Sequence, residues 1–303
     1  MPEGDSVWRA AAALHSGLAG RQLLRSDFRV PALATVDLSG RTVEEAVSRG
    51  KHLLIRIGPD PSTGARAVTL HSHLMMEGRW EIEDLDPLAA GSGSPGRRRP
   101  GASSARSQRR ARPKHTIRAV LETAGTRATA SSVQQLVIVA REQEDRLVGH
   151  LGPDLLAPQW SAQHLQEAVR RLLERPDRPI AAALMDQSRL AGIGSIYRCE
   201  LLFLHRLAPQ TPVADVPDLQ AIVEDAHELL LRNRDSGPRV TTGDPRPGRQ
   251  LWVYGRERRP CRRCGTPILK RTWDDAAGQR DPRTGLRAPA RERPFYLCPR
   301  CQR

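Results

Sequence analysis

The sequence predicts an α+β protein of several domains. A β-rich N-terminal part with one leading helix precedes a helical part and a small cysteine module. Three observations predict this arrangement. Apolar residues recur at helical spacing over residues 5–19, change to short β-type runs from about 23 to 155, and return to helical spacing from Ser161. Two Cys-x-x-Cys pairs follow Gly255. The length of 303 residues agrees with two or three domains, at about 150 residues for each.

Local signals mark the elements within these parts. Residues 5–19 form an amphipathic pattern that Gly20 can end, which predicts the leading helix. The runs 52–57 and 133–139 are typical of strands, because apolar and β-branched residues dominate them. The helical part is expected to hold four helices, which begin near Ser161, Pro179, Ser195 as N-cap, and Pro217.

The composition excludes some classes of protein and favours others. Lys and Arg number 48 against 34 Asp and Glu, so the formal net charge is +14 and a polyanionic partner is expected. No apolar run approaches the roughly 20 residues that span a bilayer, which excludes a membrane-spanning helix. The start of the chain lacks the basic and apolar regions of a signal peptide, so we do not expect secretion.

The positive charge is concentrated in two segments. Residues 97–114 hold eight basic residues and no acidic one, and residues 256–303 hold fourteen against five. The remainder of the chain is slightly acidic, which an Arg-rich composition alone explains poorly. Residues 89–113 consist almost entirely of Gly, Ser, Pro, Ala and Arg, so we expect a disordered basic insert in the β-rich part. This insert could contact a nucleic acid or be a solvated linker.

The most specific motif is the cysteine set near the C-terminus. Two Cys-x-x-Cys pairs with 33 residues between them are formed by Cys261, Cys264, Cys298 and Cys301. Four thiolates in two such pairs match a tetrahedral structural zinc site, so one Zn²⁺ is expected. The spacer is longer than usual, and we interpret residues 274–292 as an extension of a hairpin. Four unrelated cysteines are the alternative. The fifth, Cys199, lies in an apolar helix and is interpreted as a buried thiol.

Two further segments could carry chemistry. Gly192-Ile193-Gly194-Ser195 precedes a helix, where backbone amides can approach an anion, although a helix-packing turn gives the same pattern.

Removal of Met1 would give Pro2 a secondary α-amine, whose pKa of about 7.7–8.0 leaves part of it neutral and nucleophilic. Its iminium with an aldehyde cannot lose an N–H proton, so it remains a cationic electron sink, and Glu3 could move protons. A proline at position 2 is otherwise only a processing signal.

Four motifs resemble one known family in their order along the chain. They are residues 1–5 (MPEGD), 50–54 (GKHLL), 190–198 (LAGIGSIYR) and 293–302 (RPFYLCPRCQ). This pattern is similar to the formamidopyrimidine-DNA glycosylase/endonuclease VIII family of helix–two-turn–helix repair enzymes, and most to its actinobacterial endonuclease VIII-like members. The resemblance implies an N-terminal β-sandwich catalytic domain over 1–158, a helix–two-turn–helix DNA-binding domain over 159–254 and a zinc-finger β-hairpin over 255–303.

The resemblance also implies roles for particular residues. Pro2 would be the Schiff-base nucleophile, Glu3 the general acid, Lys51 a proton donor and phosphate contact, and Arg293 a phosphate contact of the zinc hairpin. Gly192, Gly194 and Ser195 would contact DNA, although Ser195 replaces the family's usual Asn. Met75 and Met76 would fill the gap that an extruded base leaves, unless they are core residues of a strand. His71 and His73 share a strand face, and we interpret them as packing or backbone contacts because no third metal ligand is near in the sequence.

The implied activity is that of a bifunctional DNA glycosylase and abasic-site lyase of base excision repair. Oxidised pyrimidines are the expected substrates, with β-elimination and then δ-elimination, in a cytoplasmic, nucleoid-associated bacterial monomer that binds damaged DNA and needs no nucleotide cofactor. Two alternatives remain open at this point: an oxidised-purine (formamidopyrimidine/8-oxoguanine) glycosylase, and a non-catalytic zinc-dependent DNA-binding protein that is indifferent to Pro2.

The basic insert gives a first testable prediction. Deletion of residues 91–112, which hold seven arginines, is expected to leave turnover on short duplexes near normal but to weaken the salt dependence of DNA binding. The slope of log K against log salt falls by about 0.9 for each phosphate contact that is lost, and mobile charges give part of this. The slope can be measured by titration at several salt concentrations. An unchanged slope would make the insert a passive linker, and loss of folding would contradict its assignment as a loop.

Overall fold

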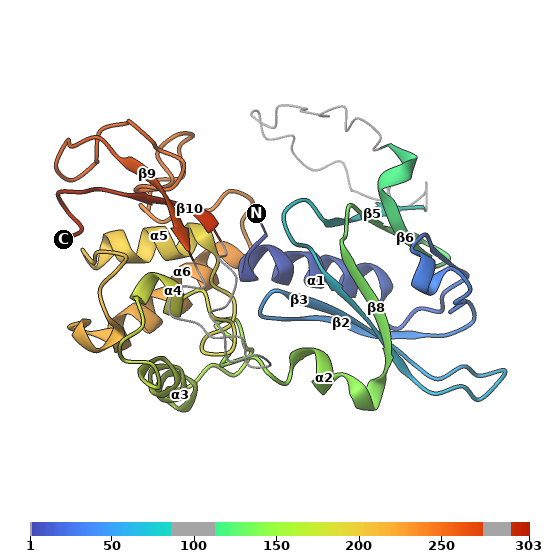
Figure 1. The fold of residues 1–303 in the computed structure, drawn as a ribbon. Helices are drawn as coiled ribbons and strands as arrows, with labels where there is room; N and C mark the ends of the chain where they lie inside the picture. Colours follow the sequence, from blue (N-terminus) through green and yellow to red (C-terminus); the bar gives the residue numbers. More distant parts are fainter. Residues whose placement is uncertain (1, 86–112, 275–291) are drawn as a thin grey trace, which may run out of the picture. The chain divides into compact units, whose positions relative to one another are not determined.

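A computed structural model describes residues 2–85, 113–274 and 292–303 (Figure 1). The predicted insert over 89–113 and the predicted extension over 274–292 lie, apart from their end residues, outside the described residues. By its internal packing the chain divides into two compact units. The β unit contains Ala10–Val47 and His52–Glu144, and the helical unit contains Met1–Arg9, Ser48–Lys51 and Asp145–Arg303. The expected domain boundaries at 158 and 254 stay a prediction.

The β unit is built from two four-stranded sheets (Figure 1). The first has the strand order β1 (Arg25–Phe28), β6 (Ile117–Glu122), β7 (Thr126–Ser131) and β5 (Arg79–Asp84). The second has the order β2 (Val43–Arg49), β3 (His52–Ile57), β4 (Val68–His73) and β8 (Gln135–Ala140). The β-sandwich prediction is confirmed. Three of the four described 3₁₀ turns, Pro31–Leu33, Lys114–Thr116 and Arg141–Gln143, belong to this unit.

The sandwich core follows the alternation of the strands. In β3 the side chains of Leu53, Ile55 and Ile57 are fully buried, as the period of two predicts. Leu54 is buried as well, so both faces of this strand are covered over part of its length. Between the sheets, the Trp80 Nε1 atom donates to Ser72 Oγ at 3.0 Å, which satisfies two polar groups inside the core.

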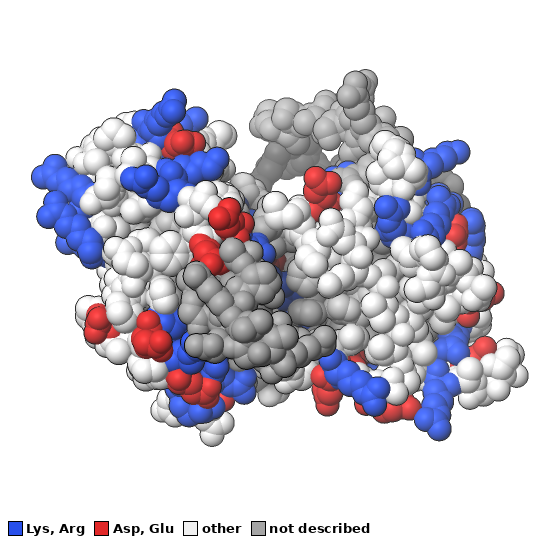
Figure 2. Space-filling view, in the orientation of Figure 1, with Lys and Arg blue, Asp and Glu red and all other residues white. Residues whose placement is uncertain are grey.

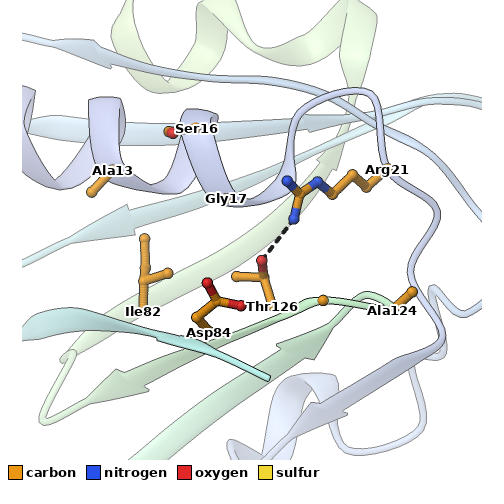
Figure 3. A pocket seen from close by; sticks show the side chains of 9 residues that line it. Ala13, Ser16, Gly17, Arg21, Ile82, Asp84, Ala124 and Thr126 are labelled. Carbon is orange, nitrogen blue, oxygen red and sulfur yellow. Dashed lines mark hydrogen bonds between the residues drawn. The ribbon is translucent and has the colours of Figure 1, made fainter. Parts of the chain in front are cut away.

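Helix α1 (Gly4–Leu18) confirms the predicted leading helix, and Gly20 follows it with a φ of 72°. Its second half packs in the β unit at Gly17, where an added Cβ would lie 3.0 Å from Thr126 Cγ2. Figure 3 shows the pocket beside this contact. In it Arg21 Nη1 donates to Thr126 Oγ1 at 2.8 Å, and Asp84 lies beside Thr126. A small residue at position 17 therefore allows the helix to approach the sheet.

The helical unit contains α2 (Asp145–Val148), α3 (Ala162–Leu173), α4 (Ile180–Ala183), α5 (Ser195–Leu204) and α6 (Leu219–Arg234), with a 3₁₀ turn at Val213–Asp215. Two predicted starts are wrong by one or two residues. Helix α5 has Gly194 as its N-cap and Ser195 as its first residue. Helix α6 begins after Asp218 rather than at Pro217, because the Asp218 side chain accepts a hydrogen bond from Ala221 N at 2.8 Å.

The C-terminal hairpin consists of β9 (Leu269–Asp274) and β10 (Glu292–Leu297), which pair in antiparallel register. Phe295 of β10 is fully buried in the same apolar cluster as Tyr197 and Leu201 of α5. The hairpin is thus joined to the core of the helical unit. None of the helices among the described residues is long and apolar enough to cross a membrane.

Candidate active site and metal centre

The Glu3 carboxylate occupies the N-terminus of helix α5. It is fully buried and accepts hydrogen bonds from the backbone amides of Gly194 at 2.9 Å, Ile196 at 2.8 Å and Tyr197 at 3.4 Å. A Cβ on Gly194 would lie 2.4 Å from Glu3 Cδ, so only glycine fits at this position. Helix N-termini favour negative charge, and here the anion is a side chain of the protein itself. DNA contacts by Gly194 and Ser195 stay a prediction.

Backbone contacts fix the first turn of α1 to the same segment. Gly4 N donates to Gly192 O at 2.9 Å, and Gly192 N donates to Gln187 Oε1 at 3.0 Å. A Cβ on Gly4 would lie 3.0 Å from Gly192 Cα, and Gly192 has a φ of 118°, so this approach requires both glycines. The turn at residues 192–194 therefore binds the first turn of α1. This contact holds Pro2, which is half-buried, beside α5.

A pocket of about 450 Å³ lies beside Pro2. Its lining in the helical unit also includes Arg9 of α1, Ile196 of α5, and Arg239 and Gln250 from the segment after α6. This volume is within the range of about 300–1,000 Å³ that is usual for small-molecule sites. The pocket brings the predicted nucleophile together with two guanidinium groups that no sequence motif indicated.

Asp5 of α1 is the second buried carboxylate of this region. It pairs with Arg239 at 2.7 Å and accepts from the Tyr197 hydroxyl at 3.2 Å. Burial raises the pKa of Tyr197, and the neighbouring Asp5 charge adds to this rise. Burial by itself would lower the pKa of Arg239, but its hydrogen bonds to Asp5 outweigh this effect and the pKa is raised. The Arg239 guanidinium is therefore held in its charged form.

The turn that carries Lys51 docks on the same glycine segment. Gly50 adopts a φ of 57°, and its amide donates to Asp154 Oδ2 at 2.9 Å. Asp154 also accepts from Leu156 N at 3.0 Å, and burial raises the pKa of its carboxyl group. A Cβ on Gly50 would lie 3.0 Å from Ala191 Cβ. No sequence pattern indicated Asp154, which holds the Lys51 turn in place.

Replacing Asp154 with alanine is expected to lower the free energy of unfolding by about 1–3 kcal/mol, because the buried amides of Gly50 and Leu156 lose their acceptor. Urea denaturation measures this change. The matched control is Glu228→Ala on the exposed face of α6, which is expected to change the free energy of unfolding by no more than about 0.5 kcal/mol. An Asp154→Ala protein as stable as the wild type would contradict the anchoring role.

The four predicted cysteine ligands form one cluster. The Sγ atoms of Cys261 and Cys301 lie 3.9 Å apart, and Cys264 Sγ lies 3.5 Å from both Cys298 Sγ and Cys301 Sγ. All four lie within 4.8 Å of one another, and this is the only such group of potential ligands within residues 2–85, 113–274 and 292–303. A tetrahedral zinc ion with Zn–S bonds of about 2.3 Å requires S–S separations of about 3.8 Å, so the donor set fits this metal.

The thiols of the cluster differ in acidity. Hydrogen bonds from Thr266 lower the pKa of Cys264 to about 6, whereas burial raises the pKa of Cys301 to about 12. Four thiolates therefore do not coexist here without a compensating cation. Near the cluster, Arg263 N donates to Cys261 Sγ at 3.4 Å, as is common around metal-bound sulfur.

Arg293 lies on β10, opposite Trp273 of β9, and lines a pocket of about 500 Å³ with Lys270 and Arg271. In Figure 2, Lys and Arg side chains gather over the part of the helical unit where Figure 1 places β9. Next along β10, Tyr296 N donates to Cys199 Sγ at 3.5 Å, and the Phe295 ring lies 5.2 Å from the Arg198 guanidinium. The strand of Arg293 is thus attached to α5, whose N-terminus holds Glu3.

Met75 and Met76 belong to the β unit and lie in the turn between β4 and β5. Met75 has a φ of 50°, which is uncommon for a residue other than glycine, and Met76 is 63% exposed. The alternative that Met76 is a core residue is therefore wrong. A role of the two methionines in filling a gap in DNA stays a prediction.

The histidines make local contacts, as expected. His71 Nε2 lies 2.9 Å from His52 Nδ1, and the two rings are stacked. His73 Nδ1 accepts from Met75 N at 3.1 Å, which supports the turn described above. Burial lowers the pKa of His71, so its neutral form is favoured.

Comparison with known proteins decides the family. The model of the formamidopyrimidine-DNA glycosylase N-terminal domain matches residues 1–133, and that of the formamidopyrimidine-DNA glycosylase H2TH domain matches 151–238. A "Probable endonuclease 8 2" of Streptomyces coelicolor is 43% identical over 304 residues, which cover 100% of this chain and 94% of that protein. The chain belongs to the formamidopyrimidine-DNA glycosylase/endonuclease 8 family.

Other members of the formamidopyrimidine-DNA glycosylase/endonuclease 8 family agree with this assignment. The "DNA-(apurinic or apyrimidinic site) lyase Nei2" of Mycolicibacterium smegmatis is 43% identical, with 100% of this chain and 99% of that protein covered. Among solved structures, Lactococcus lactis Fpg in complex with DNA that contains an abasic site has a TM-score of 0.70 at 20% identity, with full coverage of both chains. This structural likeness confirms the family fold.

Proposed function

We propose that this chain is a bifunctional DNA glycosylase and abasic-site lyase of base excision repair that uses Pro2 as its nucleophile. The class of enzyme follows from the family and from relatives named endonuclease 8 and DNA-(apurinic or apyrimidinic site) lyase. One observation carries the choice of nucleophile: Glu3 is locked on the N-terminus of α5, so the adjacent Pro2 faces a pocket instead of extending into solvent.

The reaction begins when the neutral secondary amine of Pro2 attacks C1′ of the damaged nucleotide. The C1′–N bond of the base breaks, and the base leaves with a proton. Glu3, whose carboxyl group accepts hydrogen bonds from three backbone amides, takes the proton of the Pro2 amine and passes it to the departing base. The C1′–O4′ bond of the sugar then breaks, O4′ takes a second proton from water, and an iminium forms between Pro2 N and C1′ beside Glu3.

The strand is then cut by elimination. The iminium acidifies the C2′ proton, and loss of this proton breaks the bond from C3′ to the phosphate oxygen. A second elimination breaks the bond from C5′ to its phosphate oxygen, and hydrolysis of the iminium frees Pro2. In this proposal Lys51 and Arg293 hold backbone phosphates, and Met75 and Met76 fill the gap left by the extruded nucleotide.

The metal has a structural role in this proposal. Cys261, Cys264, Cys298 and Cys301 would hold one zinc ion, which fixes the hairpin of β9 and β10. Every chemical step is carried by residues of the chain. The protein would act as a monomer in the bacterial cytoplasm, associated with the nucleoid through its positive charge.

Oxidised pyrimidines are the proposed substrates. The support is the relation to proteins named endonuclease 8, which reach 43% identity over the full chain, whereas a "Formamidopyrimidine-DNA glycosylase" of Synechococcus is 38% identical over 50% of it. Oxidised purines are the second candidate, because a solved neighbour is MutM in complex with DNA that contains carbocyclic 8-oxo-G.

Borohydride trapping tests the proposal. The protein with Met1 removed is expected to form a covalent complex with abasic DNA and with oligonucleotides that carry oxidised pyrimidines, and to do so more slowly with oxidised purines. Both duplex and single-stranded oligonucleotides belong in the panel, and the ends of the cut strand distinguish β-elimination from δ-elimination. Equal trapping by protein that retains Met1 would show that Pro2 is not the nucleophile.

A further inference from the structure

A buried ion pair joins the first turn of α1 to the segment that follows α6. Arg239 Nε donates to Asp5 Oδ2 at 2.7 Å, and Arg239 Nη2 donates to Asp5 Oδ1 at 2.7 Å and to Ser6 Oγ at 2.6 Å. The Asp5 side chain is 0% exposed and that of Arg239 is 12% exposed. The contact is bidentate, so it fixes both the position and the orientation of the guanidinium plane.

The same pair is connected to Glu3 through one tyrosine. The Tyr197 hydroxyl donates to Asp5 Oδ2 at 3.2 Å, and Tyr197 N donates to Glu3 Oε2 at 3.4 Å. The Arg239 guanidinium also lies over the Tyr197 ring, 5.7 Å from its centre. Glu3, which precedes α1, and Asp5, in its first turn, therefore both make contacts with α5, and Asp5 is also bound by Arg239.

Arg239 itself lies on an anchored stretch of chain. The fully buried Glu200 of α5 accepts from the Thr241 hydroxyl and from the amides of Trp252 at 2.7 Å and Val253 at 2.9 Å. Asn233 Oδ1, at the end of α6, accepts from Val240 N at 2.7 Å. Val240 and Thr241, which follow Arg239, and Trp252 further along are thus hydrogen-bonded to α5 and α6. These contacts hold the backbone of Arg239 in place beside Asp5.

Arg239 and Pro2 line one pocket together with Arg9. A change in the position of Arg239 therefore alters the wall of this pocket, and through Asp5 it also alters the turn that carries Pro2. A buried ion pair is weak evidence for stability, because well-packed hydrophobic residues of similar volume often replace one without loss. The bidentate contact does, however, fix the geometry of both groups.

We propose that Arg239 is a positioning residue for the reaction: its ion pair with Asp5 aims the Pro2 amine into the pocket and sets the wall against which the substrate base lies. This inference rests on the proposed function. It concerns orientation, so the chemical groups that react remain Pro2 and Glu3.

The test uses a neutral pair, Asp5→Asn with Arg239→Gln, which removes one negative and one positive charge together. A second variant, Arg239→Lys, keeps the charge but loses the bidentate contact. We expect single-turnover base excision and trapping on abasic DNA to fall by about 10- to 100-fold in the neutral pair, because small displacements of reacting groups have effects of this size. The Kd for DNA and the melting temperature should change little. Arg239→Lys should recover part of the rate.

An ion pair elsewhere provides the matched control. Arg56 Nε donates to Glu144 Oε2 at 3.0 Å in the β unit, and Arg56→Gln with Glu144→Gln should keep the wild-type single-turnover rate. Wild-type rates in the folded Asp5/Arg239 neutral pair would overturn the proposal, and so would an equal loss in the control pair. If the neutral pair does not fold, a wild-type rate in Arg239→Lys overturns it. Failure of the wild-type protein to be trapped would refute the proposed function instead.

Discussion

The Pro2→Gly variant is expected to lose at least about tenfold of its borohydride-trapped complex with abasic DNA, whereas Glu3→Gln should lose base excision and keep most of the trapping. Glycine presents a primary amine, so its Schiff base can lose a proton and become a weaker electron sink. Glutamine has one acceptor oxygen in place of two, and its NH₂ group cannot shuttle a proton between the Pro2 amine and the leaving base. Quantitative gels that measure trapping and excision in parallel give the ratio that separates the two variants.

Two comparisons make this result decisive. Glu228→Gln on α6 changes a carboxylate outside the site and should leave both activities at the wild-type level. If Glu3→Gln instead loses trapping and excision equally, Glu3 is needed for the attack itself or for folding of the N-terminus. Melting curves distinguish the two explanations, because a folding defect lowers the melting temperature of Glu3→Gln. The Glu3 side chain accepts three hydrogen bonds at the N-terminus of α5 and so also contributes to stability.

The second large effect couples the metal to Arg293. Arg293→Ala and Cys298→Ser are both expected to weaken DNA binding and base excision by about 10- to 100-fold, because a bidentate phosphate contact to a guanidinium contributes about 1.5–3 kcal/mol. Cys298→Ser removes a ligand, so the hairpin no longer holds the strand that carries Arg293. Both variants should keep partial trapping on abasic DNA, where the base is already gone.

Zinc content, excision and trapping should be measured on the same preparations. Cys199→Ser is the matched control, since Cys199 lies in α5 outside the cluster and its replacement should leave the zinc content unchanged. If Cys298→Ser loses its metal and still excises a damaged base at the wild-type rate, the hairpin serves stability alone and Arg293 is not part of the site.

Local sequence patterns predicted which helices and strands exist more accurately than the residues at which the helices begin. The apolar period predicted α1 and the strand at 52–57, and the Cys-x-x-Cys spacing predicted the cysteine cluster, since each signal depends on residues close in the sequence. The N-cap of α5 is Gly194 rather than Ser195, and a Cβ at position 194 would lie 2.4 Å from Glu3 Cδ. That steric limit comes from a residue 191 positions away, which no local pattern can reveal.

The candidate site shows the same division. Pro2 and Glu3 could be proposed from the chemistry of their own side chains. Arg239 and Asp154 could not, because each acts through a partner 234 or 104 positions away, on Asp5 and on Gly50. One sequence signal for such partners was available: two acidic residues, Glu3 and Asp5, lie at the start of a helix. Both are buried, and a buried carboxylate requires a hydrogen-bond donor or a positive charge beside it.

The dependence of the N-terminus on distant partners has a consequence for how the protein is made. Glu3 is synthesised well before its partners in α5, because Ile196, whose amide donates to it, follows it by 193 residues. Arg239, which pairs with Asp5, follows that residue by 234 positions. At about 5–20 residues per second, the ribosome needs roughly 10–50 seconds to supply them. During this interval Glu3 and Asp5 lack their partners, so the proposed site can assemble only after residue 239 has been synthesised.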